Sequence, residues 1–145
     1  MKLALIGVMA LACACGGKGT TSAAKPDARP LFERLGGQPA INAVVHEFVA
    51  TTGADPRINL FFANTDKAKL EASMDEHICS ITGGGCTYKG KSMLDAHTNM
   101  HLAEKDFDAF MDDLQKTLAK LKVPQRETDE VLGAFRGMKA DVVGH

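Results

Sequence analysis

Residues 41–49 have the sequence INAVVHEFV, which indicates the fold class. Its apolar residues follow the spacing i, i+3, i+4, i+7 and i+8, which puts them on one face of an α-helix. They are Ile41, Val44, Val45, Phe48 and Val49. The spacing predicts a helix that starts near Gln38-Pro39 and ends near Gly53.

The same periodicity continues on both sides of this helix. It predicts further helices over about 30–35, 65–82, 92–97 and 104–121, and a last one that starts at Pro124. Gly36-Gly37 and the run Gly83-Gly84-Gly85 break the chain between helices. We expect Asn64 or Thr65 to cap the 65–82 helix. Two apolar stripes should be buried, one at Leu70, Met74, Ile78 and Ile81, the other at Phe107, Phe110, Met111, Leu114, Leu118 and Leu121. No segment alternates with a period of two, so the class is all-α, with helix pairs packed around one core.

Residues 1–15 differ from the rest of the chain. Lys2 is followed by an uncharged apolar stretch from Leu3 to Ala14. This stretch is shorter than the about 20 residues that a membrane-spanning helix needs, and it is typical of a signal peptide. It ends in LACACGG, which resembles a bacterial lipobox, with Cys15 (or Cys13) as the lipidated residue. Ordinary secretion is the alternative.

Residues 16–30, GGKGTTSAAKPDARP, contain no large apolar side chain, so we expect a disordered tether. Residues 31–145 then form one domain. The formal net charge of −1 argues against a nucleic-acid partner, because such proteins carry a basic excess.

Six features in order resemble the truncated haemoglobins of group I. They are LFERLGG at 31–37, the pair Phe61-Phe62, the glycines after the 65–82 helix, Tyr88-x-Gly90, Met93-x-x-Ala96-His97, and the closing pattern from Phe107 to Leu132. The resemblance covers about residues 31–143. It implies a two-over-two helical sandwich around a haem.

The resemblance also implies roles for individual residues. His97 matches the proximal histidine that binds the iron, and Phe62 matches the aromatic residue that stacks on the haem. Met93 belongs to the same motif as His97. Without the family, a buried structural His97 would be the plainer interpretation, and a zinc pair formed by His97 and His101 at i, i+4 is a further alternative.

The distal side departs from the family pattern. Group I members usually hold O2 with a Tyr and a Gln, but the matching positions here are Val49 and Met74, and Leu70 occupies the other distal position. None of these side chains donates a strong hydrogen bond. We therefore expect weaker retention of O2. Met74 is either core packing or a sixth iron ligand opposite His97.

Cys79 and Cys86 are the only cysteines in residues 31–145. Export would place them in an oxidising compartment, and the glycines between them allow a close approach, so we expect a disulfide. Two free thiols are the alternative. The haem-attachment motif C-x-x-C-H is absent, which predicts haem b held without a covalent bond.

These observations predict a monomeric haem protein that binds O2, NO or CO and is lipid-anchored at the bacterial cell envelope. A haem redox protein is the alternative function: it would carry out NO dioxygenation, peroxide handling or electron transfer, and would need a reductase as partner. A haem-free helical interaction module is the third class.

Overall fold

The computed structural model describes residues 27–145, and within that range it contains helices and no strand. The helices are α1 (Leu31–Leu35), α2 (Gly37–Ala54), α3 (Lys67–Ile81), α4 (Met93–His97), α5 (Glu104–Lys120) and α6 (Gln125–Gly137). Two short 3-10 helices, η1 (Asn59–Phe62) and η2 (Lys139–Asp141), follow α2 and α6. The predicted all-α class is confirmed. The predicted signal peptide, with Cys13 and Cys15, lies outside the described residues, as does most of the tether.

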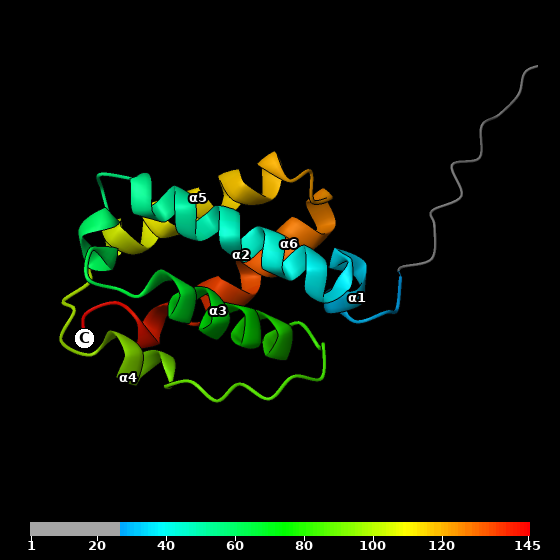
Figure 1. The fold of residues 1–145 in the computed structure, drawn as a ribbon, viewed down its shortest axis with the longest axis horizontal. Coiled ribbons are helices and arrows are strands. Elements are labelled where there is room, and N and C mark those ends of the chain that lie inside the picture. Colours follow the sequence, from blue (N-terminus) through cyan, green and yellow to red (C-terminus); the bar gives the residue numbers. More distant parts are fainter. Residues whose placement is uncertain (1–26) are drawn as a thin grey trace, which may run out of the picture.

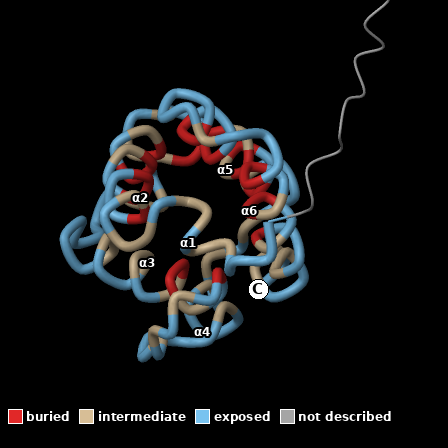
Figure 2. Tube along the Cα trace, turned by 90° about the vertical axis from the view of Figure 1, so that its right-hand side faces the viewer, coloured by how far each residue is buried: buried red, intermediate tan, exposed pale blue. Residues whose placement is uncertain are grey.

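Four long helices form the body of the domain. α2 packs against α3 and α5, and α5 packs against α6, so the pair α2/α3 lies against the pair α5/α6 (Figure 1). The buried residues gather on the inward faces of α2, α5 and α6 (Figure 2). The five apolar residues of the 41–49 stretch are all buried, as their spacing predicts.

The core is closed by aromatic contacts between helices. The rings of Phe48 on α2 and Phe110 on α5 meet edge to face with centroids 4.8 Å apart, and Phe110 also lies near Phe135 on α6. Such edge-to-face pairs match the positive ring edge to the negative ring face. These contacts fix α2 against the α5/α6 pair.

An ion pair fastens α1 to α6. Arg34 Nη1 donates to a carboxylate oxygen of Glu127 at 2.6 Å, and Arg34 also pairs with Glu130. The guanidinium and Glu127 are largely withdrawn from water, so each neutralises the buried charge of the other. Just before α1, the Arg29 carbonyl accepts a hydrogen bond from Arg34 Nε at 3.1 Å, so the end of the predicted tether lies against the domain.

Three local predictions are wrong. The cap of α3 is Asp66, whose carboxylate accepts from the Lys69 amide at 3.2 Å, and not Asn64 or Thr65, because the helix starts later than expected. Ile81 and Leu121, predicted as buried, are 39% and 38% exposed. Ile81 is the last residue of α3 and Leu121 directly follows α5, so both lie where a helix ends.

Candidate functional site

A large cavity opens between α3 and α4 and reaches back to α5 and α6. Its volume is about 720 Å³, within the range of pockets that hold cofactors and drug-sized ligands. The apolar part of its wall comprises Ile58, Phe61, Phe62, Leu70, Met74, Ile78, Met93, Met100, Leu102, Phe107, Phe110, Phe135, Met138 and Val142. A cavity of this size with a mostly apolar wall suits a large hydrophobic ligand.

His97 lies on the wall of this cavity, at the last residue of α4, and is half-buried. Its Nδ1 lies 2.7 Å from the Met93 carbonyl oxygen, one turn earlier on the same helix. In the tautomer that carries hydrogen on Nδ1, this nitrogen donates to the carbonyl, and Nε2 keeps its lone pair. A second hydrogen-bond partner of this kind fixes both ring orientation and tautomer in metal-binding histidines. The local geometry therefore prepares Nε2 as a metal ligand.

The zinc alternative does not have the helical geometry that it needs. α4 ends at His97, and His101 is exposed, has a left-handed backbone with φ of 52°, and does not line the cavity. The two histidines therefore do not share a helix face. Within residues 27–145, no cluster of three or more His, Cys, Asp or Glu side chains could hold a metal ion.

The other predicted site residues fall into two groups. Phe62 from η1, Leu70 and Met74 from α3, and Met93 from α4 all line the cavity with His97. Val49 does not: its side chain is 4% exposed and belongs to the packed core around α2. α3 thus presents apolar side chains to the cavity at both predicted distal positions.

α3 also presents an imidazole, that of His77, to the cavity. His77 lines the cavity, its Nε2 lies 3.3 Å from the Met138 sulfur on α6, and its ring meets the Tyr88 ring edge-on. Burial lowers the pKa of His77, which favours the neutral imidazole. His77 and Met138 are 61 positions apart in the sequence, so no local pattern predicts this contact.

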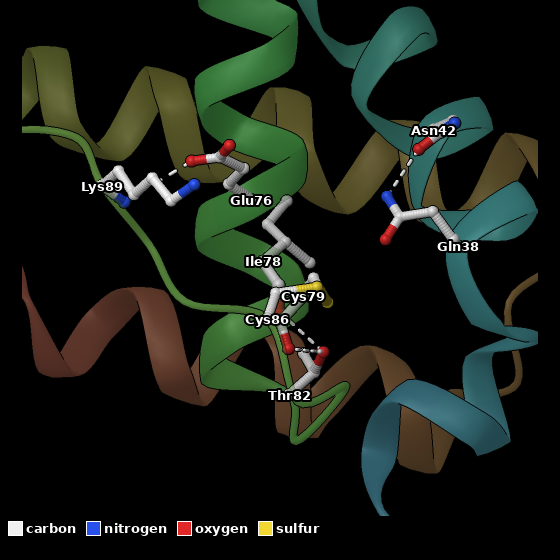
Figure 3. Close-up of a disulfide and its surroundings, with 8 residues drawn as sticks. All are labelled: Gln38, Asn42, Glu76, Ile78, Cys79, Thr82, Cys86 and Lys89. Atoms are coloured by element: carbon white, nitrogen blue, oxygen red, sulfur yellow. Dashed lines mark hydrogen bonds between the residues drawn. A yellow bond between two sulfur atoms is a disulfide. The ribbon is translucent and has the colours of Figure 1, made fainter.

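The loop after α3 forms one edge of the cavity and is fixed by a disulfide. Cys79 and Cys86 are bonded, with Cα atoms 5.7 Å apart (Figure 3). Beyond the bond the loop turns back along α3, and the Lys89 amide donates to Glu76 at 3.4 Å. This path brings the Tyr88 ring onto His77.

The backbone of this loop can follow that path only because two of its residues are glycines. A Cβ at Gly84 would lie 2.5 Å from the Phe32 ring and 2.6 Å from Cys79 Sγ, and one at Gly90 would lie 2.2 Å from the Tyr88 hydroxyl. Only glycine lets the backbone approach these groups so closely. The glycines that stood out in the sequence thus allow α1 and Tyr88 to pack against the loop.

The fold agrees with the comparison to known proteins. The family model described as "Bacterial-like globin" matches residues 30–143. A group 1 truncated hemoglobin of Tetrahymena thermophila is 33% identical over 114 residues, which cover 79% of this chain and 94% of the relative. This chain belongs to the truncated haemoglobins. A group 1 relative from Synechocystis, GlbN, is 36% identical over 105 residues, or 70% of this chain and 85% of that protein.

Solved structures of truncated haemoglobins share the fold. The Fe(III) form from Tetrahymena pyriformis superposes with a TM-score of 0.78 at 32% identity, covering 81% of this chain and all of that one. The 2/2 hemoglobin of Synechococcus, in the cyanomet state and with covalently attached heme, gives 0.76 at 34% identity with the same coverage. The two-over-two arrangement predicted for this truncated haemoglobin is confirmed, and membership of the globins supports haem-based binding of diatomic gases in general.

Proposed function

We propose that this truncated haemoglobin holds haem b without a covalent bond, with His97 Nε2 as the iron ligand. The carrying observation is the 2.7 Å contact of His97 Nδ1 with the Met93 carbonyl, on the wall of a cavity large enough for the cofactor. Bound haem supplies the iron that takes a gas molecule, and the protein supplies the axial nitrogen and an apolar enclosure. Both cysteines of the described domain form a disulfide, which leaves neither thiol to attach to the haem.

We also propose that the distal side discriminates weakly in favour of O2. Leu70 and Met74 are the α3 side chains at the matching positions, and neither donates a hydrogen bond. A donor to a strongly polar ligand contributes on the order of 1.5–3 kcal/mol. Without it, O2 should dissociate faster by roughly tenfold for each 1.4 kcal/mol lost. CO, which is less polar, should be affected less.

Substitution of His97 tests the iron ligand. The His97→Gly variant is expected to lose the absorption spectrum of a histidine-ligated ferrous haem and to regain it when free imidazole is added. The matched control is His101→Ala, which removes an exposed histidine outside the cavity and should leave the spectrum unchanged. An unaltered spectrum in His97→Gly without imidazole would refute His97 ligation.

A haem redox function is the second candidate. The observation that favours it is the half-buried thioether of Met74 on the cavity wall, which has no hydrogen-bond partner. A His/Met ligand pair raises the reduction potential and suits electron transfer. Under this hypothesis Met74→Leu should convert low-spin ferric haem to high-spin and lower the potential. An identical spin state in Met74→Leu and wild type excludes Met74 as the ligand.

Anchoring at the bacterial cell envelope is the remaining part of the proposal. It rests on the signal-peptide pattern with Cys15 or Cys13, outside the described residues, and on the disulfide, which is typical of oxidising compartments. Within residues 27–145, no helix has the length and apolar character needed to cross a bilayer. Mass spectrometry of the mature protein from the native host would detect a lipidated N-terminal cysteine. Finding the protein in the cytoplasmic fraction with an intact N-terminus would refute export.

A further inference from the structure

The helix that carries His97 is poorly supported by its own residues. α4 has five residues, and none of them is buried. Figure 2 shows its trace without a buried segment, in contrast to α2, α5 and α6. A single helical turn is unstable in water because nucleation costs more free energy than one turn returns. Contacts from outside α4 must therefore determine where His97 stands.

The turn that follows α4 is itself conformationally unfavourable. Asn99 and His101 have φ angles of 67° and 52°, in the left-handed region. For residues with a Cβ this region is disfavoured by contacts with the backbone. A turn with two such residues so close together needs partners that stabilise it.

Those partners come from the far end of the sequence. The His101 amide donates to the main-chain oxygen of His145 at 2.7 Å, and the Gly144 amide donates to the Leu102 carbonyl at 2.9 Å. We call this reciprocal pair of backbone hydrogen bonds the C-terminal clamp. In Figure 1 the last residues run beside the turn after α4, where the C-terminus is marked.

The segment before the clamp also reaches the site. η2 contacts α4, and Val142, directly after η2, lines the cavity. Val143 packs against the main core. The segment 139–145 is therefore anchored in the core, touches the cavity, and is bonded to the turn behind His97.

We propose that the C-terminal clamp is a positioning element for the iron ligand: Gly144 and His145, through their main-chain groups, hold the turn at residues 98–102 and thereby fix α4 and His97. The inference rests on the proposed ligation of iron by His97. Release of the clamp lets the turn relax from its left-handed conformation, which broadens the range of His97 positions and shortens the residence of haem.

Three variants of the holoprotein test the clamp. A chain ending at Val143 lacks both hydrogen bonds. Gly144→Ala weakens them, because Gly144 has φ of 86° and a Cβ disfavours that conformation even though the space around it is open. His145→Ala is the matched control: it removes the side-chain contact of Nε2 with the Ala140 carbonyl at 3.0 Å and keeps both clamp bonds.

Two measurements separate positioning from simple stability. One is the iron–imidazole stretching band in the resonance Raman spectrum of the ferrous form, and the other is the rate of haem transfer to excess apomyoglobin. We expect the chain ending at Val143 to shift or broaden the band and to lose haem about tenfold faster. Gly144→Ala should show a smaller change of the same kind, and His145→Ala should stay within about twofold of wild type.

The outcomes are distinct. A normal band and a normal rate of haem loss in both the shortened chain and Gly144→Ala overturn the clamp and leave His97 ligation standing. If His145→Ala behaves like the shortened chain, the side chain is responsible and the clamp is also overturned. If His97→Gly keeps the wild-type spectrum without added imidazole, His97 ligation is overturned and the clamp with it. If the shortened chain does not fold, the comparison of Gly144→Ala with His145→Ala decides.

Discussion

Reduction of the Cys79–Cys86 disulfide should destabilise the domain by an amount that follows from its loop. The two cysteines are 7 positions apart, so the bond closes a loop of about eight residues. The chain-entropy relation then gives about 2.5 kcal/mol at 25 °C, lost when the unfolded chain is no longer restrained. In a domain of this size that corresponds to a fall in Tm of roughly 10 °C.

This estimate assumes that the folded loop survives without the bond, and the structure supports that assumption. The Gly84 amide donates to the Cys79 carbonyl at 2.8 Å, and the Thr82 hydroxyl donates to the Ile78 carbonyl at 2.6 Å. The Phe32 amide donates to the Thr82 carbonyl at 2.9 Å, which ties the turn to α1. Because these bonds do not involve sulfur, the effect of reduction should lie mainly in the unfolded state.

Urea denaturation followed by far-UV circular dichroism measures the effect. We would compare oxidised wild type, wild type reduced with a phosphine, and Cys86→Ser, all at one concentration of protein and haem because bound ligand adds to stability. Reduced wild type and Cys86→Ser should coincide, about 2.5 kcal/mol below the oxidised protein. The reductant should have no effect on Cys86→Ser. A difference below about 0.5 kcal/mol between oxidised and reduced wild type would refute the chain-entropy account.

Three other substitutions test the packing, the electrostatics and the distal wall. Gly84→Ala should lower the free energy of unfolding by about 1–3 kcal/mol, because the new Cβ would collide with the Phe32 ring. Gly133→Ala, where the space on α6 is open, should raise the free energy of unfolding by about 0.5–1 kcal/mol. Equal urea midpoints for the two variants would contradict the steric argument. Burial raises the pKa of Asp113, so this carboxyl favours folding when protonated and opposes it once pH rises through the folded-state pKa. Asp113→Asn should therefore raise Tm at pH 7, and this increase in Tm should vanish as pH falls below the ordinary pKa of an aspartate. An increase in Tm that persists at low pH would contradict this explanation. Met74→Gln places an amide donor of similar volume on the cavity wall and should slow O2 dissociation by roughly tenfold, while Met74→Leu should not. Stopped-flow displacement of O2 by CO measures the dissociation rate of each variant. Equal rates for the two variants would refute the distal-donor argument.

Helices that cover the core along their whole length were predictable from sequence. On α2 every predicted apolar position is buried, because a stripe at helical spacing faces its neighbours on each turn. The stripe on α3 behaves differently: Leu70 and Met74 are only half-buried, since they face the cavity, and Ile81 extends past the end of the core. Periodicity identifies the face of a helix but not what lies opposite it.

Some residues of the candidate site could be identified from the sequence, and others could not. His97 was singled out through the resemblance to the family, and Cys79 through the glycines that separate it from Cys86. Met138 and Val142 could not be identified as cavity-lining residues, because they lie far along the chain and no local pattern assigns them to the cavity. Val49 shows the converse, since a matching position in the family pattern does not guarantee a place on the cavity wall.

The helices, their breaks at glycine and proline, and the family could all be predicted from the order of residues along the chain, because each depends on local patterns of side chains. Three contacts became known only from the folded chain: His77 with Met138, Cys79 with Cys86, and residues 144–145 with the turn after α4. The physical reason is that these contacts depend on the directions in which the loops return the chain. Those directions are set by the packing of all the helices together.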